Sequence, residues 1–453
     1  MLLRQIAAYA ASDARRTLPP NVLHHAKRAV LDWLGALYAG TRVAPGLQLI
    51  KAHADELGAG PCSLPGYGTT TTGATAAWIN GSVSHAVEFD DIYRDAIYHP
   101  GCPTIAAGLA ASELTNASGL AFLNAIVVGY EISTRIGVAI QPSHYRFFHT
   151  TGTVGCFGAA AAASALLAPG DANTAQHALA TAATFASGLQ QALRSDAMTK
   201  ALHAGHAAAV GIRAAQGAKH GITGVIDILE GVAGFGAALS DGPDWSRAIA
   251  GLGSDYNITR ITQKNHGCCG HTFAAIDAVL ELRSQYGLRP DQVRTIEVST
   301  YQTALDVTGN FDPRTAFEGK FSLPYVVCNA LVHGSVRLAA FEPERLTDPV
   351  VRNLMARLSL KADAELSKHF PTMRAARVVI VMTNGERHEH FAPYRKGDPE
   401  APLSDRQLED KFHELADPVL GFSHSTRLRD LVWNLDRIDV KDLNLASGPR
   451  IKS

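Results

Sequence analysis

The stretch GCFGAAAAASALLA, residues 155–168, consists mostly of small side chains. Alanine favours the helix more than any other residue, and small side chains let the axes of neighbouring helices approach closely. The stretch therefore predicts a central helix that is packed on all sides. It is shorter than the roughly 18 apolar residues that a membrane-spanning helix needs, so we expect no membrane segment here.

Helical patterns continue on both sides of this stretch, up to about residue 250. In residues 21–39 and 119–138, large apolar side chains recur at steps of three and four, as on one face of a helix. Asp171 and Asn173 stand before Gln176 in a cap-like segment that predicts a new helix at this point.

The pattern changes near residue 290. VRTIEVSTY, residues 293–301, alternates apolar and polar side chains with the period of a strand. ARVVIVMTNGERHEHF, residues 376–391, contains two extended runs around Asn384 and Gly385. This dipeptide predicts a hairpin with a two-residue turn, in which both positions have positive φ.

Helix returns after these strands, where Ser404 and Gln407 have the spacing of a capping box. We therefore expect a mainly α protein with an inserted α+β lid domain. The lid domain would comprise residues 261–397, and the all-helical domain residues 1–260 together with 398–453.

Charge and composition argue against several classes of function. The 453 residues carry 41 basic and 42 acidic side chains, for a net charge of −1, so neither nucleic acid nor an anionic membrane is an expected partner. The N-terminus lacks the apolar core of a signal peptide. The six cysteines show no C-x-x-C spacing, which favours reduced thiols over disulfides or a zinc site. We expect a cytoplasmic protein.

The densest group of ionisable side chains lies in HAVEFDDIYRDAIYHPG, residues 85–101. Its carboxylates could cap a helix, pair with an arginine or bind a metal. Because H-E-x-x-H, calcium-loop and paired-cysteine motifs are absent from the sequence, we expect no metal. His99, followed by Pro-Gly, predicts a turn that exposes the imidazole. The ionisable residues of the stretch are His85, Glu88, Asp90, Asp91, Arg94, Asp95 and His99.

Lys200 lies in a second cluster, SDAMTKALHAGHAA, among the small residues of a predicted buried helix. Burial of an unpaired ammonium lowers its pKa, and a lysine with a lowered pKa is a candidate general base. His203 is one turn further along and shares its face. The alternative is that Lys200 reaches solvent from a helix end.

Three further stretches contribute candidates. HYRFFHTTG contains Tyr145 and His149 as proton donors or acceptors and Arg146 as a fork for a carboxylate, with an interface at a helix end as the alternative. QKNHGCCGHTF contains Lys264 and two adjacent cysteines, for which structural packing is favoured over thiol chemistry. GKFSLPYVV contains Tyr325.

In their order along the chain, these stretches resemble the MmgE/PrpD family. HAVEFDD…HPG, GYEISTRIG, TTGTVGCFGAAAA, TKALHAGHAA, QKNHGCCGHTF, FSLPYVV and KGDPEAPLSD each look like a segment of that family, and together they span nearly the whole chain. The family includes 2-methylcitrate dehydratase, cis-aconitate decarboxylase and iminodisuccinate epimerase. The resemblance implies the MmgE/PrpD-type two-domain fold, a homodimer and no cofactor.

The resemblance also implies a set of site residues. They are Glu88, Ile92, His99, His149, Lys200, Lys264 and Tyr325. Decarboxylase and dehydratase members look to have aspartate at the position of Glu88 and threonine at that of Ile92, and isoleucine cannot hydrogen-bond. The chain also lacks the longer Trp-containing loop that methylcitrate dehydratases have before His99. These departures leave the epimerase-like branch open.

The implied chemistry is proton abstraction α to a carboxylate of a small di- or tricarboxylate, in a lyase of dehydratase or decarboxylase type. An epimerase of an iminodisuccinate-like amino-dicarboxylate is the alternative. A non-catalytic carboxylate-binding protein and a metal-dependent lyase are the other classes. The expected roles are Lys200 as base, His99 and Tyr325 as proton donors or orienting groups, Lys264 and His149 as carboxylate holders, Glu88 and Asp91 as orienting groups, and Tyr145, Arg146, His203 and Ile92 as substrate-binding residues.

Overall fold

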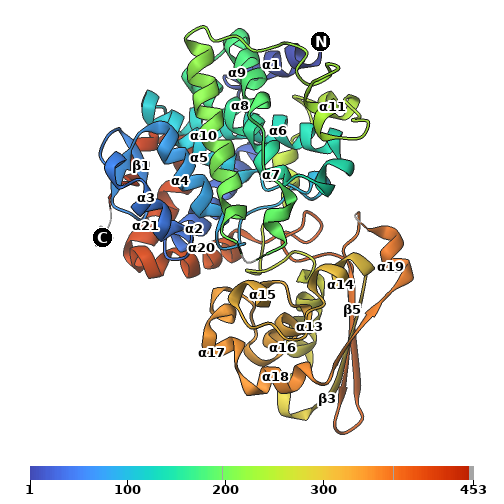
Figure 1. Ribbon diagram of the computed structural model, residues 1–453. Helices are drawn as coiled ribbons and strands as arrows, with labels where there is room; N and C mark the ends of the chain where they lie inside the picture. Colours follow the sequence, from blue (N-terminus) through green and yellow to red (C-terminus); the bar gives the residue numbers. More distant parts are fainter. Residues whose placement is uncertain (196, 371, 448–453) are drawn as a thin grey trace. The chain divides into compact units, whose positions relative to one another are not determined.

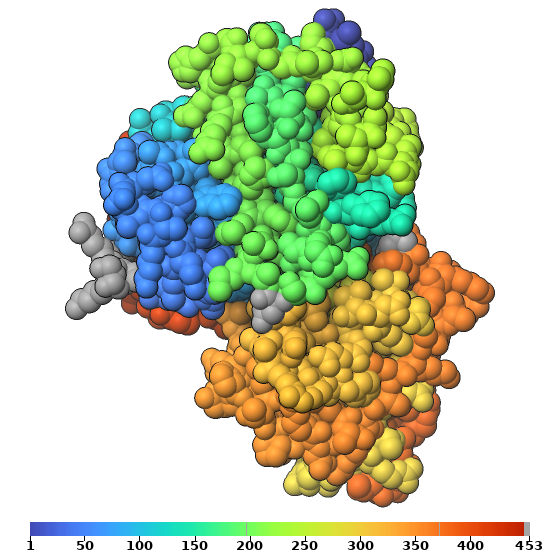
Figure 2. Space-filling model, viewed as in Figure 1, coloured from blue at the N-terminus to red at the C-terminus, as the bar shows by residue number. Residues whose placement is uncertain are grey.

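The computed structural model describes residues 1–195, 197–370 and 372–447. The chain divides into two compact units: unit 1 is Met1–Thr262 with Ser404–Ser453, and unit 2 is Gln263–Leu403, yellow to orange in Figure 1 and Figure 2. Unit 1 is mainly helical and unit 2 contains a small mixed sheet, so the expected fold class is confirmed. Unit 1 also contains a two-stranded antiparallel sheet, Cys62–Leu64 with Thr69–Thr71, which the expected all-helical domain did not include. The expected domains, residues 1–260 with 398–453 and residues 261–397, stay a prediction.

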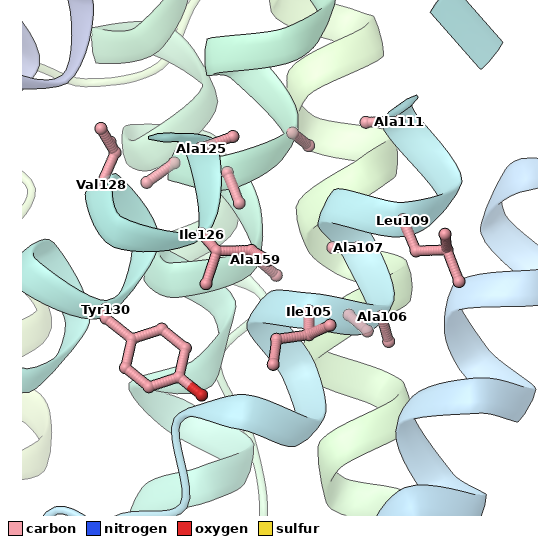
Figure 3. Packing of buried hydrophobic residues seen from close by; sticks show 14 of the residues in the cluster. Ile105, Ala106, Ala107, Leu109, Ala111, Ala125, Ile126, Val128, Tyr130 and Ala159 are labelled. Carbon is pink, nitrogen blue, oxygen red and sulfur yellow. The ribbon is translucent and has the colours of Figure 1, made fainter. Parts of the chain in front are cut away.

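The helix α8, Gly155–Leu167, is the central helix of unit 1, and every one of its residues is buried. In Figure 3, Ala159 of α8 lies among apolar side chains of two neighbouring helices, including Ile105 and Ile126. The prediction of a central helix packed on all sides is confirmed. The neighbours of α8 are α5 (Gly101–Thr115), α6 (Gly119–Ile140), α9 (Ala172–Thr184) and α10 (Thr199–Lys219).

Small residues set the distance between α8 and α10. A Cβ atom at Gly211 of α10 would lie 2.3 Å from the Cβ of Ala159 and 2.5 Å from its carbonyl carbon. Real Cβ contacts are never this short, so the helices pack with backbone against backbone here.

The remaining helices of unit 1 surround this centre. The Ser404–Gln407 capping box is present at the start of α20, and the Asp171 side chain caps α9, as predicted. The helix α20 packs against α2, so the segment after the insertion belongs to the core of unit 1. The other elements of unit 1 are α1 (Leu2–Asp13), α2 (Pro20–Gly40), α3 (Gly46–Ala52), β1 (Cys62–Leu64), β2 (Thr69–Thr71), α4 (Gly73–His85), α7 (Thr150–Thr153), α11 (Phe235–Leu239), α12 (Ser246–Ile249), α20 (Asp405–Leu420) and α21 (Phe422–Trp433).

Unit 2 is built on a four-stranded sheet with the strand order β4-β3-β5-β6. The strand β3 pairs in parallel with β4 and antiparallel with β5, and β5 and β6 form the predicted hairpin. The helix α13 packs against β5 and β6. The elements of unit 2 are α13 (Phe273–Tyr286), β3 (Val293–Thr300), α14 (Gln302–Thr308), α15 (Ala316–Lys320), α16 (Leu323–His333), α17 (Pro343–Leu346), α18 (Pro349–Met355), β4 (Leu358–Ala362), α19 (Ala364–His369), β5 (Ala376–Met382) and β6 (Arg387–Ala392).

The turn of this hairpin differs from the prediction. Gly385 has a φ of 92°, but Asn384 is not among the residues with positive φ. The amide of Gly385 donates to the carbonyl of Met382 at 3.0 Å, and the amide of Met382 donates to Glu386 at 2.9 Å. The connection is therefore longer than two residues, and such a loop needs a left-handed residue only at its end.

Two helical stretches, Gly119–Ile140 and Thr150–Leu167, are long and apolar enough to cross a membrane by length and composition alone. The second runs through α7 into α8, so it is longer than the run quoted from the sequence. In each stretch, 94% of the most apolar window is buried inside the protein. Core helices of soluble proteins pass the same test, so these stretches are weak evidence for a membrane protein.

Candidate active site

The acidic loop, residues 86–100, connects α4 to α5 in unit 1. Glu88 in this loop has a φ of 59°, a left-handed conformation that residues other than glycine rarely adopt. Ile92 exchanges two backbone hydrogen bonds of 2.9 and 2.8 Å with Thr262. The loop is thus tied to the last residue of unit 1 before the insertion.

Asp90 is the centre of a cluster of buried polar side chains. Its Oδ2 lies 2.7 Å from Nδ1 of His85 and 3.0 Å from Nδ1 of His99, and it also accepts a hydrogen bond of 3.2 Å from the thiol of Cys102. Burial by itself would raise the pKa of Asp90, but the two histidines outweigh it and hold that pKa well below the usual range. Asp90 is therefore an ionised carboxylate at neutral pH.

His99 is less exposed than the prediction of a turn at the following Pro-Gly implied. Its side chain is only 15% exposed, because Pro100 already caps α5 and the imidazole packs at 4.9 Å, edge to face, against His85. The Nδ1 atom also lies 2.8 Å from the backbone oxygen of Asp91. Both acceptors contact Nδ1, so Nδ1 carries a hydrogen and Nε2 is the basic nitrogen of the neutral ring.

Asp91 has a different environment from Asp90. Its carboxylate accepts a hydrogen bond of 2.7 Å from the hydroxyl of Tyr130 and one of 3.0 Å from the amide of Gly101. Burial raises the pKa of Asp91 to about 7, with the charges of Asp32 and Asp90 adding to the effect and the hydrogen bonds opposing it. Its side chain contacts Tyr130 and its backbone oxygen contacts His99, so the expected orienting role fits the backbone better than the carboxylate.

Lys200 forms an ion pair with Glu88 across 112 positions of sequence. Both side chains are largely buried, at 13% and 12% exposure. Burial would lower the pKa of Lys200, but Glu88 outweighs it and the net shift is upward. The expected lowered pKa is therefore wrong for this state, because the lysine has a carboxylate partner that the local sequence did not show. Lys200 is a cation here.

His149 and His203 form a second pair, with 3.0 Å between their Nδ1 atoms. His149 also stacks on His85 at 5.5 Å. Burial lowers the pKa of His149 well below its usual value, and the neighbouring His85 and Lys200 lower it further. Burial likewise lowers the pKa of His203 to about 4. Both rings are neutral at pH 7, and one donates to the other.

Three other predicted residues of unit 1 are placed less centrally. Tyr145 is half-buried and close enough to raise the pKa of Lys200 slightly. Arg146 is exposed, with its guanidinium 4.9 Å from the centre of the Phe147 ring. The side chain of Ile92 is buried. Asp196, which belongs to the cluster around Lys200 in the sequence, lies outside the described residues.

Two predicted residues, Lys264 and Tyr325, belong to unit 2 and are described within that unit. Lys264 is 1% exposed and lies in the segment before α13. Tyr325 is fully buried in α16, and its hydroxyl donates a hydrogen bond to the backbone oxygen of Ala340. Their expected catalytic roles stay predictions.

The adjacent cysteines support the packing interpretation. Cys268 is fully buried, and burial raises the pKa of its thiol to about 12, so the reactive thiolate is disfavoured. Its sulfur lies 3.3 Å from the hydroxyl of Thr272 at the start of α13.

Among the residues that the structure describes, one group could hold a metal ion. His85, Asp90 and His99 each offer one ligand atom, and these atoms lie within 4.8 Å of one another. The same atoms already satisfy one another by hydrogen bonds, which is the arrangement of an orienting carboxylate between two imidazoles.

A cavity of about 790 Å³ lies elsewhere in unit 1. Its walls come largely from α4 and α10 and include Trp78, His206, Val210 and Arg213. Its lining does not include the described residues of the acidic loop. The ionisable cluster is therefore separate from this cavity.

Sequence reasoning missed several members of the cluster. His85 and Asp90 were visible in the quoted stretch but were not assigned to the site, although a carboxylate five residues after a histidine is a usable signal. Tyr130 gave no signal, because it lies in an apolar stretch that the helical pattern fully explained.

Comparisons with known proteins cover more than nine tenths of the chain. The curated relatives include the cis-aconitate decarboxylase-like protein oryM of Aspergillus oryzae, which is 30% identical over 94% of this chain and 93% of its own length. The cis-aconitate decarboxylase of Aspergillus terreus is 26% identical over 96% of this chain and 93% of its own. The human cis-aconitate decarboxylase is 28% identical over 95% and 92%.

Family models match both parts of the chain. The model of the MmgE/PrpD N-terminal domain matches residues 4–248, and that of the MmgE/PrpD C-terminal domain matches residues 266–437. By these two matches, the chain belongs to the MmgE/PrpD family.

Proposed function

We propose that this protein is an acid–base lyase of decarboxylase type. Its substrate would be a small tricarboxylate or, as the alternative, a small dicarboxylate. The observation that carries the proposal is the buried Lys200–Glu88 ion pair next to the Asp90 cluster in one unit. Similarity to cis-aconitate decarboxylases over more than nine tenths of the chain supports the same class.

The proposed reaction puts negative charge where the site holds positive charge. When the bond from carbon to the leaving carboxylate breaks, CO₂ departs and the electron pair stays on the substrate, delocalised onto a remaining carboxylate. Preplaced cations and hydrogen-bond donors stabilise that charge. Lys200 supplies an ammonium in its charged form. A substrate carboxylate would share this ammonium with Glu88.

A carbon of this delocalised anion must then take up a proton. We assign the donation to the Nε2–H of His99 in its protonated form, because Nδ1 of the same ring is held by Asp90 and by the backbone oxygen of Asp91. An orienting carboxylate fixes the tautomer and stabilises the protonated ring. A positioned acid of this kind typically contributes about 10²–10⁴-fold in rate.

The proposal includes further parts that were expected from the sequence. The enzyme would work as a homodimer without a cofactor, as the resemblance implies, and in the cytoplasm, as the sequence pattern indicates. His149 and Lys264 would hold substrate carboxylates, and Tyr325 would donate a proton or orient the substrate.

NMR in D₂O with the purified protein tests the proposal. The candidate acids are cis-aconitate, citrate, 2-methylcitrate, tartrate and iminodisuccinate. We expect cis-aconitate to lose CO₂ and its product to carry one deuteron on carbon. If cis-aconitate stays intact while another acid exchanges a carbon-bound hydrogen, the decarboxylase proposal is wrong. Tight binding without any exchange would favour a non-catalytic carboxylate-binding protein.

A second candidate has its own observation. Glu88 and Ile92 stand where the resemblance implies aspartate and threonine, and the side chain of Ile92 is buried and offers no hydrogen bond. This change favours a substrate that lacks one polar group of cis-aconitate, or an epimerase that inverts the carbon it deprotonates. Racemisation of iminodisuccinate in the same experiment would identify the epimerase.

A further inference from the structure

Lys411 is a buried cation outside the cluster described so far. It lies on α20, in the segment after the insertion, and is 1% exposed. Its ammonium donates to Oδ1 of Asp32 on α2 at 2.6 Å and to the backbone oxygen of Phe89 in the acidic loop at 2.8 Å. The same nitrogen lies 4.4 Å from the centre of the Phe89 ring. Three segments far apart in sequence thus meet at one side chain.

Stability alone does not account for this ion pair. A buried ion pair is often no more stable than apolar residues of similar volume, because both charges lose their hydration. Oδ2 of Asp32 is buried and has no hydrogen-bond partner in the described part of the chain. Burial raises the pKa of Asp32, although Lys411 opposes that effect. The pair is therefore not optimised as a stabilising contact.

The contact of Lys411 with Phe89 links the Asp32–Lys411 ion pair to the acidic loop. Phe89 stands between Glu88, which pairs with Lys200, and Asp90, which binds the two imidazoles. Glu88 has a positive φ, and such a conformation persists only where the surroundings hold it. The hydrogen bond to the Phe89 carbonyl holds the peptide group between Phe89 and Asp90, and Phe89 directly follows Glu88.

We propose that Lys411 is a positioning residue, which acts through the Phe89 carbonyl to hold Glu88 and Asp90 in the geometry that the reaction needs. Asp32 holds the Lys411 ammonium in place. The inference rests on the proposed function for its kinetic consequence only, because the geometry of the histidines is measurable without turnover.

The test uses the full-length protein with paired substitutions. Asp32→Leu/Lys411→Met removes both charges together, so no carboxylate is stranded, and the fold is expected to survive. Arg28→Met is the matched control: Arg28 is buried on the same α2 and forms an ion pair with Asp405, which lies on the same α20 and outside the acidic loop. Asp32→Asn/Lys411→Gln keeps a hydrogen-bond donor at position 411 without its charge.

We expect Asp32→Leu/Lys411→Met to lower kcat about 10–100-fold with much less change in KM, since misplaced reacting groups lose rate on this scale. Asp32→Asn/Lys411→Gln should recover part of that loss, and Arg28→Met should match the wild type. NMR of the histidine ring hydrogens should show shifted Nδ1–H signals for His85 and His99 in the first variant only.

Two results would overturn the inference. One is a folded Asp32→Leu/Lys411→Met protein with wild-type histidine signals and wild-type kcat. The other is an equal fall of kcat in Arg28→Met, which would make the effect one of helix packing. A wild-type protein that converts none of the acids refutes the proposed function instead, and the histidine spectra then decide the positioning role alone.

Discussion

Asp90 is a negative charge in a site where its side chain is 2% exposed, and it persists there because two imidazoles bind it. Asp90→Asn keeps the shape of the side chain and removes the charge. The ring of His99 would keep the backbone oxygen of Asp91 as the acceptor of its Nδ1–H but would lose the negative charge that stabilises the protonated ring, so we expect kcat to fall by about 10²-fold or more. Steady-state assays measure the effect. Asp95→Asn, on an exposed residue of the same loop, is the control and should leave kcat unchanged.

Asp91 makes a prediction about pH. Its pKa is raised to about 7 in the folded protein, from an ordinary value of 3.8. Between these values the folded state holds a proton that the unfolded state has lost, so this group's contribution to stability is complete below pH 3.8 and disappears as pH rises to 7. Asp91→Asn cannot ionise. As pH rises from 5 to 8, the free energy of unfolding of Asp91→Asn should therefore increase by a few kcal/mol relative to that of the wild type.

Urea unfolding at several pH values measures this difference. The buried amide of the Asn side chain also changes stability by an amount that does not depend on pH. The test is therefore how the difference in free energy of unfolding changes with pH, and the size of that difference at a single pH does not decide it. A slope of zero between pH 5 and 8 would show that Asp91 is already ionised in the folded protein at pH 5.

At this scale, the sequence identified the ionisable stretches but not their partners. Glu88, His99 and Lys200 were all predicted as site residues, and the structure brings them into one unit. The raised pKa of Lys200 was out of reach, because its cause is a carboxylate 112 positions away. Local composition predicts burial, whereas the sign of a pKa shift depends on the partner that folding brings in.

The contact of α8 with α10 makes a prediction about helices. Gly211→Ala adds a Cβ atom 2.3 Å from that of Ala159 and 2.5 Å from its backbone carbon. Backbone atoms cannot give way as a flexible side chain does. The helices must therefore separate, and we expect the free energy of unfolding to fall by about 2 kcal/mol. Denaturant unfolding followed by circular dichroism measures the change.

Gly217 is the matched control for this change, on the same helix. The nearest atom to its added Cβ is Cδ1 of Ile222 at 3.0 Å, the far end of a flexible side chain. Gly217→Ala should therefore be neutral, or stabilise by up to about 1 kcal/mol through helix propensity. If Gly211→Ala and Gly217→Ala change the free energy of unfolding equally, close packing of α8 and α10 is not the cause of the effect at Gly211.

Elements were predictable where periodicity or capping specified them. The central helix α8, the strands β3, β5 and β6 and the start of α20 all follow from local pattern. The turn at Asn384 was not predictable, because the dipeptide fits a two-residue turn and a longer loop equally well. Strand register decides between them, and register depends on the partner strand.

Each unit of the molecule has a separate hydrophobic core. One core cluster draws all its residues from Met1–Thr262 and Ser404–Ser453, and the other draws all of its residues from Gln263–Leu403. The first includes residues of α20, so the helical core closes only after the inserted segment has been made. The pattern change near residue 290 reveals the insertion, but only this shared core shows to which body the C-terminal segment belongs.

Because the two cores are separate, a cavity made by substitution in one core should destabilise only the unit that contains it. Leu282 of α13 is fully buried in the core of unit 2, and Leu282→Ala should destabilise that unit by about 2–5 kcal/mol. Hydrogen exchange followed by mass spectrometry should show lost protection within residues 263–403 only. Leu34→Ala, in the core of unit 1, should give the reverse pattern. If either change weakens both units equally, the two units unfold as one cooperative body, and the argument from separate cores is wrong.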